Sequence, residues 1–245
     1  PFALRGWSAW VARGEKVCSD TACAAHDAQV LAVDAATRSF SEVDAARRTA
    51  IAIAALKGAD ILLKTDDSTL RGHARAEIEA AFNASGRRRL VIAPAFPQAG
   101  RSTKKGVQFV DGTPVAQSAY ARDPVHPARI SKVADLVPET ARGALEIDAE
   151  TQGALEAQIR AISEPQEVLW VGSPGLAQAL AARFSRADPE ASASNTRRRA
   201  LIVIGSANPV SRAQAALAER AGASVLCAPE RCADPAAVLD ALAEK

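Results

Sequence analysis

Short aliphatic runs that alternate with longer alanine-rich segments constrain the fold of this 245-residue chain more than any other feature. The runs are continuously apolar rather than alternating in polarity, which is typical of strands that are buried on both faces. Those expected to form strands lie at 30–33, 61–63, 90–93, 145–147, 168–171, 201–204 and 225–226. Because helical segments separate them, the sequence predicts an α/β fold with a mainly parallel sheet that helices cover on both faces.

The segments between the runs carry helical spacing and signals for helix ends. Ser41 opens one of them with Ser-Glu-Val-Asp, a start that resembles a capping box, in which a hydroxyl and a later carboxylate satisfy free helix amides. Gly86 stands where a C-terminal helix cap belongs. Helices are therefore expected at 41–56, 73–85, 176–184 and 213–221.

Two stretches depart from this alternation. Residues 94–127 show no helical pattern, and two short runs at 107–110 and 113–115 flank Asp-Gly, which predicts a β-hairpin. A polar run, SRADPEASASNTRRR, separates two groups of strands and helices at 185–199. The predicted organisation is a first α/β domain over 1–185, a linker over 186–199 and the start of a second α/β domain over 200–245.

The charge balance and the cysteines exclude several classes of protein. Thirty basic residues against 28 acidic ones leave a net charge of +2, which is too balanced for a protein that binds the nucleic-acid backbone. Nucleic acid is therefore not an expected partner. There is no long uncharged apolar stretch and no secretory leader pattern, so a membrane is not an expected partner either, and the expected location is cytoplasmic. Four cysteines (Cys18, Cys23, Cys227 and Cys232) form two widely separated pairs without matching histidines, which favours free thiols over a metal site.

Polar loops follow several of the predicted strands. In an open parallel sheet, ligands bind beyond the carboxyl ends of the strands, so these loops should share one edge of the sheet. They contain hydroxyls, glycines and fixed cations, and they read Thr-Arg-Ser at 37–39, KTDDSTLRG at 64–72, PAFPQAGRSTKKG at 94–106, GSPG at 172–175 and GSANP at 205–209. Donors and cations at one edge predict a site for an anion.

The KTDDSTLRG loop is the densest of these segments. Arg71 can grip a carboxylate with two parallel hydrogen bonds, Lys64 adds a point charge, and Ser68 and Thr69 add hydroxyl donors. Asp67 is a poor neighbour for an anion unless it has a role such as accepting a proton from a substrate hydroxyl, which makes it the candidate catalytic residue. The alternative is structural: Asp67 and Ser68 cap the following helix, and Arg71 pairs with Glu77 or Asp66.

The next loop offers Arg101 and Thr103, with a solvated basic loop as the alternative. Arg122 and His126 could close over the site, although Asp-Pro and His-Pro are also plain turn formers. His73 is expected to start a helix. Neither a Walker loop nor a G-x-G-x-x-G fingerprint is present.

Five ordered segments resemble the four-carbon acid sugar kinase family: KTDDSTLRGH, VIAPAFPQAGRSTKKG, VDGTPVAQSAYARDPVHP, LWVGSPGLAQAL and VIGSANPVSRAQ. The resemblance runs from about residue 1 to residue 228 and implies an N-terminal α/β domain for the sugar acid and a C-terminal domain for ATP. It implies an ATP- and Mg²⁺-dependent kinase that phosphorylates a hydroxyl of threonate, erythronate or 2-oxotetronate, with a homodimer as a possible assembly.

By position, the resemblance places Lys64, Asp67, Ser68, Thr69 and Arg71 in the sugar-acid motif, Arg101 and Thr103 in its second loop and Arg122 in its third. It assigns nucleotide binding to Gly205 and Ser206, and we predict the same role for Ser173. The family's Asp-Asp-x-Thr-Gly-Ala segment would precede residue 1 and its glycine-rich nucleotide loops would follow residue 245, so the chain is expected to be a substrate domain with the start of a nucleotide domain. Two other functions stay open: a non-catalytic module that binds or senses a sugar acid, and an RNA-associated protein that uses the arginines at 87–89 and 197–199.

Overall fold

A computed structural model describes residues 1–13, 28–184 and 209–224 of the chain. The chain forms two compact units, Pro1–Ser192 and Ala193–Lys245. In the second unit the structure describes one helix, α6 (Pro209–Arg220), which overlaps the helix predicted at 213–221. The predicted strands at 201–204 and 225–226, the linker, Gly205, Ser206 and the four cysteines lie outside the described residues.

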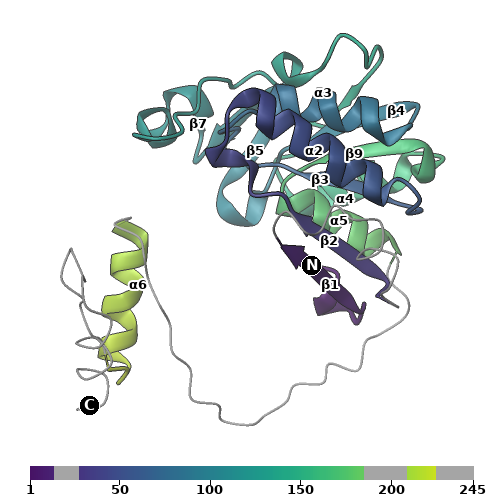
Figure 1. Ribbon diagram of the computed structural model, residues 1–245. Coiled ribbons are helices and arrows are strands. Elements are labelled where there is room, and N and C mark those ends of the chain that lie inside the picture. The colour runs from purple at the N-terminus through teal and green to yellow at the C-terminus, as the bar shows by residue number, and fades with distance from the viewer. Residues whose placement is uncertain (14–27, 185–208, 225–245) are drawn as a thin grey trace. The chain divides into compact units, whose positions relative to one another are not determined.

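A four-stranded parallel sheet forms the centre of the first unit (Figure 1). Its strands lie in the order β3 (Leu62–Thr65), β9 (Val168–Gly172), β4 (Arg89–Ala93) and β8 (Leu145–Glu146). All three neighbouring pairs are parallel. Every residue of β9 is buried. The prediction of an α/β fold with a parallel sheet is therefore confirmed.

Helices cover both faces of this sheet, as the alternation predicted. Leu169 and Val171 of β9 pack in one apolar cluster with residues of α2 (Glu42–Leu56) and α3 (Ala74–Ser85). Val168 and Trp170 point to the opposite face and pack with residues of α4 (Gln152–Ala161) and α5 (Pro174–Phe184). Successive side chains of a strand alternate between faces, so one short apolar strand supplies both halves of the core.

The helix ends follow the signals in the sequence. The Ser41 side chain caps α2 by accepting a hydrogen bond from the Asp44 amide, and Asp44 and Glu42 lie in the first turn. Helix α3 ends at Gly86, whose φ of 67° is left-handed. Glycine adopts this backbone conformation without the strain that a Cβ atom would cause, so the Gly86 cap is confirmed. The Ser41 hydroxyl cap is confirmed as well, whereas the Asp44 carboxylate accepts from that hydroxyl rather than from a helix amide.

Two smaller sheets complete the first unit. Strands β1 (Ala9–Arg13) and β2 (Val30–Asp34) form a parallel pair. Strands β5 (Arg101–Lys104), β6 (Val107–Val110) and β7 (Thr113–Pro114) form an antiparallel sheet. Its β6–β7 turn is the predicted hairpin, with positive φ at Asp111 and Gly112. Strands β1 and β5 and helix α4 were not predicted.

Single 3₁₀ turns connect many of these elements. They are η1 (Ala3–Arg5), η3 (Thr37–Ser39), η4 (Pro97–Ala99), η5 (Val115–Gln117), η6 (Ala119–Arg122), η7 (Val133–Leu136) and η8 (Pro165–Glu167). None of the helices in the described parts of the chain has the length and apolar character needed to cross a membrane.

Two glycines bring the loops after β4 and β9 into direct contact. A Cβ atom at Gly172 would lie 2.2 Å from the Ala93 carbonyl oxygen, and one at Gly175 would lie 2.3 Å from that of Ala95. Real Cβ atoms do not approach backbone oxygens so closely, so only glycine fits at these two positions without a backbone shift. The close approach holds the carboxyl ends of the central strands together, at the edge where the predicted site loops begin.

Candidate functional site

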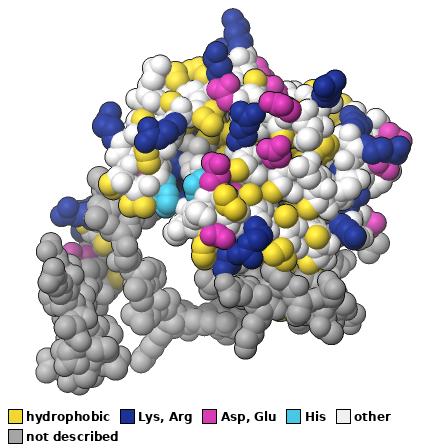
Figure 2. Space-filling model, turned by 45° about the horizontal axis from the view of Figure 1, so that its top comes forward, with side chains coloured by type: hydrophobic (Ala, Val, Ile, Leu, Met, Phe, Trp, Pro, Cys, Tyr) yellow, Lys and Arg dark blue, Asp and Glu magenta, His cyan; other side chains and the backbone are white. Residues whose placement is uncertain are grey.

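An open cleft of about 2010 Å³ runs along β3 and past its carboxyl end, between β2, α2 and the loop at 64–72. Five of the predicted site residues line it: Lys64, Asp67, Ser68, Arg71 and Arg101. Arg38, from the Thr-Arg-Ser segment after β2, lines it as well. Figure 2 shows basic and acidic side chains interspersed over one face of the molecule rather than gathered in a patch of one sign. The polar loops that follow three different strands thus meet at one site, as their place after the strands predicted.

The loop after β3 folds into a tight turn that the Asp67 carboxylate holds together. Asp67 Oδ1 accepts hydrogen bonds from the backbone N–H and the hydroxyl of Thr69, at 2.9 and 2.8 Å. The Leu70 amide donates to the Asp67 carbonyl oxygen at 2.8 Å, and Leu70 has a φ of 52°. Helix α3 begins only later, with His73 as its N-cap residue and no side-chain cap. The structural alternative, in which Asp67 and Ser68 cap that helix, is therefore excluded.

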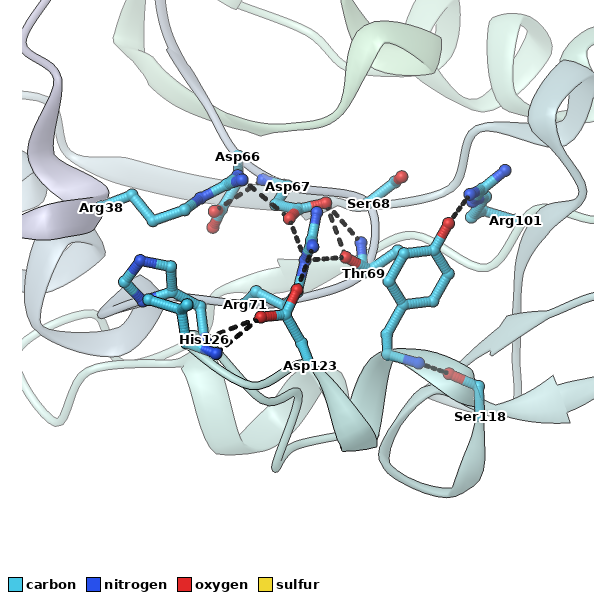
Figure 3. Close-up of polar contacts among 12 residues, drawn as sticks. Arg38, Asp66, Asp67, Ser68, Thr69, Arg71, Arg101, Ser118, Asp123 and His126 are labelled. Carbon is cyan, nitrogen blue, oxygen red and sulfur yellow. Dashed lines mark hydrogen bonds and ion pairs between the residues drawn. The ribbon is translucent and has the colours of Figure 1, made fainter. Parts of the chain in front are cut away.

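Four charged side chains form what we call the cleft network: Arg38, Asp67, Arg71 and Asp123 (Figure 3). Arg71 Nε donates to Asp67 Oδ2 at 2.8 Å, and Arg71 Nη1 donates to Asp123 Oδ2 at 2.9 Å. Arg38 Nη2 donates to Asp67 Oδ2 at 3.0 Å. Arg71 thus pairs with Asp67 and Asp123, not with Glu77 or Asp66 as the structural alternative required.

These contacts keep both carboxylates of the network ionised. Burial alone would raise the pKa of Asp67, but the hydrogen bonds from Thr69 and the charges of Arg71 and Arg38 outweigh it and lower the pKa. The backbone N–H groups of His126 and Val125, together with Arg71, lower the pKa of Asp123 to about 2. Asp67 is therefore suited to accept hydrogen bonds and is a weak base.

Tyr120 joins this network to Arg101. Arg101 Nη2 donates to the tyrosine hydroxyl at 2.6 Å, and a second guanidinium nitrogen of Arg101 donates to the Ala99 carbonyl oxygen. The Arg71 guanidinium carbon lies 5.0 Å from the centre of the same ring, and that of Arg101 lies 5.6 Å from it. Both distances lie within the range of cation–π contacts.

Lys64, predicted to bind the substrate, is turned inward. Its ammonium lies 3.0 Å from Glu77 Oε2 and 3.6 Å from Asp66 Oδ1. We call Lys64, Asp66 and Glu77 the sealed cluster, because the exposed fractions of their side chains are only 8%, 8% and 12%. Burial alone would lower the pKa of Lys64, but the two carboxylates outweigh it and raise the pKa. The charge of Lys64 is thus neutralised within the protein, although the residue lines the cleft.

Thr103 and Ser173 are also buried and hold loops together. The Thr103 hydroxyl donates to Gln108 Oε1 at 2.6 Å, and Gln108 Nε2 donates to the carbonyl oxygens of Ser68 at 2.8 Å and Pro94 at 3.1 Å. The Ser173 hydroxyl donates to the Ala95 carbonyl oxygen and accepts from the Gly175 amide. Ser173, assigned to nucleotide binding from the sequence, therefore has its hydroxyl engaged in joining β4 to β9.

Arg122 is exposed and does not line the cleft, whereas its neighbours Tyr120 and Asp123 reach the network. His126 contributes its backbone N–H to Asp123, and His73 starts α3 as predicted. Sequence reasoning did not single out Arg38, Tyr120 or Asp123 as site residues. The segments that contain them were noted, but nothing in their spacing shows that residues 118–126 fold back on the loop after β3. Across the described ranges, no group of three or more His, Cys, Asp or Glu side chains could hold a metal ion.

The fold and the cleft together define an α/β domain with arginine and hydroxyl side chains at the carboxyl edge of its sheet. The sugar-binding N-terminal domain family matches residues 6–147. The chain is 32% identical over 247 residues to a D-threonate kinase from Bordetella bronchiseptica, a match that covers 91% of this chain and 59% of that protein. It is 33% identical to a D-threonate kinase from Cupriavidus necator, with 83% and 57% covered. The chain therefore belongs to the four-carbon acid sugar kinase family, as its five motifs indicated.

A solved structure agrees with this assignment. A domain of unknown function from Bordetella bronchiseptica, crystallised as a domain-swapped dimer with bound citrate, matches with a TM-score of 0.67 and 29% identity. The match covers 99% of this chain and 65% of that one. The chain spans little more than half the length of the curated relatives that it matches.

Proposed function

We propose that the first unit binds a four-carbon sugar acid in the cleft and that the whole protein is an ATP-dependent kinase that phosphorylates a hydroxyl of this acid. The observation that carries the proposal is the set of three guanidiniums, from Arg38, Arg71 and Arg101, that line the cleft; Arg38 and Arg71 pair with Asp67 and Asp123, whereas Arg101 binds the Tyr120 hydroxyl and the Ala99 carbonyl oxygen. Among the described residues no carboxylate pairs with Arg101, so its guanidinium is a charge that an anionic ligand can neutralise. The names of the curated relatives, two D-threonate kinases among them, support the same substrate class.

We assign the roles of the side chains by what is free to contact a ligand. Arg71 and Ser68 bind the carboxylate, and Arg101 faces the group that is transferred. Thr69, Lys64 and Thr103 shape the loops from behind, because each is buried and engaged in polar contacts. Arg122, exposed beside Asp123, remains a predicted contact of the bound acid.

Asp67 stays the proposed catalytic carboxylate. Its lowered pKa makes it a weak base, so we propose that it orients the attacking hydroxyl by accepting a hydrogen bond. Phosphoryl transfer depends mainly on positioning and on stabilising charge, so orientation by an ionised carboxylate is sufficient for this role.

ATP and Mg²⁺ are proposed for the whole protein, because the relatives are kinases. When bound, the nucleotide supplies the phosphoryl group. Ser173 does not fit as a phosphate ligand, since both its donor and its acceptor are used inside the protein. The nucleotide-binding roles of Gly205 and Ser206 stay predictions, and a homodimer is proposed because the solved relative forms one.

Isothermal titration of D-threonate and D-erythronate into the protein tests this function. Replacing Arg71 with alanine should weaken binding by about 1.5–3 kcal/mol, the worth of a hydrogen bond to a charged group, or roughly 10- to 150-fold in Kd. The matched control is Arg88→Ala, which removes an exposed ion pair with Glu167 away from the cleft and should leave Kd unchanged. If Arg71→Ala binds either acid as tightly as the native protein, Arg71 is not in the site.

The kinase step is tested on the full-length protein with Mg-ATP and the same acids. Formation of ADP that requires the acid supports the kinase. Tight binding of the acid without phosphoryl transfer would instead establish the alternative, a module that binds or senses a sugar acid.

A further inference from the structure

Tyr120 contacts both Arg71, which is proposed to bind the substrate carboxylate, and Arg101, which is proposed to face the transferred phosphoryl group. It belongs to the short turn η6, and its ring lies 5.0 Å from the guanidinium carbon of Arg71 and 5.6 Å from that of Arg101. Its hydroxyl accepts a hydrogen bond of 2.6 Å from Arg101.

The protein holds the tyrosine at both ends of its turn. The Ser118 hydroxyl accepts from the Tyr120 amide at 3.2 Å, and the Ala128 amide donates to the Tyr120 carbonyl oxygen at 2.9 Å. The ring packs against an apolar cluster of Val110, Val115 and Ala128, all of them buried. The tyrosine is thus fixed from the side of the hairpin, independently of the arginines that it contacts.

The same turn also reaches Arg71 through a second residue. Asp123, which directly follows η6, binds Arg71 Nη1 at 2.9 Å, and its own amide donates to the Tyr120 carbonyl oxygen. Arg71 is therefore held between the Asp67 loop on one side and this turn on the other. The guanidiniums of Arg71 and Arg101 carry like charges and repel each other. The ring and hydroxyl of Tyr120 contact both and therefore stabilise the distance between them.

A fixed spacing between two cations selects ligands by the distance between their anionic ends. We propose that Tyr120 determines substrate length by holding Arg71 against the carboxylate of the acid and Arg101 against the phosphoryl group at its reacting hydroxyl. This inference rests on the proposed function and names the residue that fixes the distance between the two arginines at the ends of the substrate. The terminal hydroxyl of an acid that is one carbon shorter or longer lies at the wrong distance from Arg101.

Two variants of the full-length protein separate the ring from the hydroxyl. Tyr120→Phe keeps the ring and removes the acceptor of Arg101, so kcat for D-threonate should fall about tenfold while KM for the acid changes little. Tyr120→Leu removes the ring as well, so the preference in kcat/KM for four-carbon over three- and five-carbon sugar acids should fall by about tenfold or more. Val125→Ala, at an exposed position two residues beyond the Asp123 contact, is the matched control and should change neither quantity.

Steady-state kinetics with glycerate, threonate, erythronate and a pentonate supply these quantities, and thermal melting of each variant establishes that it is folded. A Tyr120→Leu enzyme that is folded and keeps the native preference for four carbons would overturn the proposal. So would a Tyr120→Phe enzyme whose kcat is unchanged. If the native protein phosphorylates and binds none of these acids, the proposed function itself fails, which is a different result from an unchanged length preference.

Discussion

The sealed cluster and the cleft network arise from neighbouring residues and have opposite properties. Asp66 belongs to the first and Asp67 to the second, although they are adjacent in the sequence. Burial raises the pKa of Asp66, whose Oδ2 atom has no hydrogen-bond partner among the described residues, whereas Thr69 and the arginines lower the pKa of Asp67 against the effect of burial. The environment at the end of a strand, not the residue type, decides whether the pKa of a carboxylate is raised or lowered.

The difference teaches how a short loop can serve stability and binding together. In the sealed cluster a single ammonium lies between two carboxylates, so its charge is paired on folding and without a ligand. In the cleft network the arginine side chains are more exposed, 49% for Arg38 and 19% for Arg71, and can exchange partners. Substitutions should therefore change stability in the cluster and affinity in the network.

The largest expected effect on stability is that of Lys64→Met. The change leaves two buried carboxylates without their cation, and breaking a buried pair in this way costs about 3–5 kcal/mol of the free energy of unfolding. Urea denaturation of the purified protein measures it. Lys104→Met, which removes an ion pair whose side chains are 56% and 60% exposed, is the control and should cost at most about 1 kcal/mol. Equal losses in both variants would remove the distinction between a sealed cluster and a surface pair.

The two regions should also respond to pH with opposite signs. Asp123 has a folded-state pKa of about 2, below that of the unfolded chain, so its stabilising contribution is complete above pH ~4 and is lost as the pH falls toward 2. Burial raises the pKa of Asp66, so above pH ~4 the folded state binds its proton more tightly than the unfolded chain, and stability falls as the pH rises through that range.

Unfolding measured across pH in two variants separates these contributions. Asp123→Asn should remove part of the loss at acid pH, and Asp66→Asn should remove part of the fall above pH 4. If both variants change the pH profile in the same direction, the opposite environments of the sealed cluster and the cleft network are not real.

The smallest expected effect is that of Arg38→Ala on stability. The Arg38 side chain is half exposed and binds Asp67 with one nitrogen, so its loss should cost only about 0.2–1 kcal/mol of the free energy of unfolding. The same variant should weaken sugar-acid binding measurably, since it removes one of the three guanidiniums that line the cleft. A large loss of stability with unchanged affinity would place Arg38 with the sealed cluster instead.

The fold could be predicted because its signals are local. Continuous apolar strands such as 168–171, the Ser41 cap and Gly86 each specify their element within a few residues, and the structure confirms them. The short strand β1 and helix α4 escaped prediction although the sequence carries signals for both: four of the five β1 residues are apolar, and Leu155 and Ile159 of α4 stand four positions apart and are buried. Strand β5, rich in polar residues, pairs with a hairpin and gives no apolar pattern.

The site was predictable only in part, because contacts between distant segments leave no trace in residue spacing. The place of the 64–72 loop after a strand located Asp67 and Arg71 correctly in one cleft. The inward turn of Lys64 depends on Glu77, which faces β3 only after α3 has packed on the sheet. Tyr120 and Asp123 reach Arg71 across about fifty positions of sequence, through a segment of turns without periodicity.

The side chain of Gln108 joins three segments that surround this cleft. Its amide hydrogens are given to the carbonyl oxygens of Ser68 and Pro94, while its oxygen accepts from Thr103, so the β-hairpin is tied to the ends of β3 and β4 through one buried group. In a nuclear magnetic resonance spectrum, those two hydrogens exchange with deuterated water only when the three segments separate. Their exchange rate therefore reports how often the three segments separate, and it can be measured without a ligand.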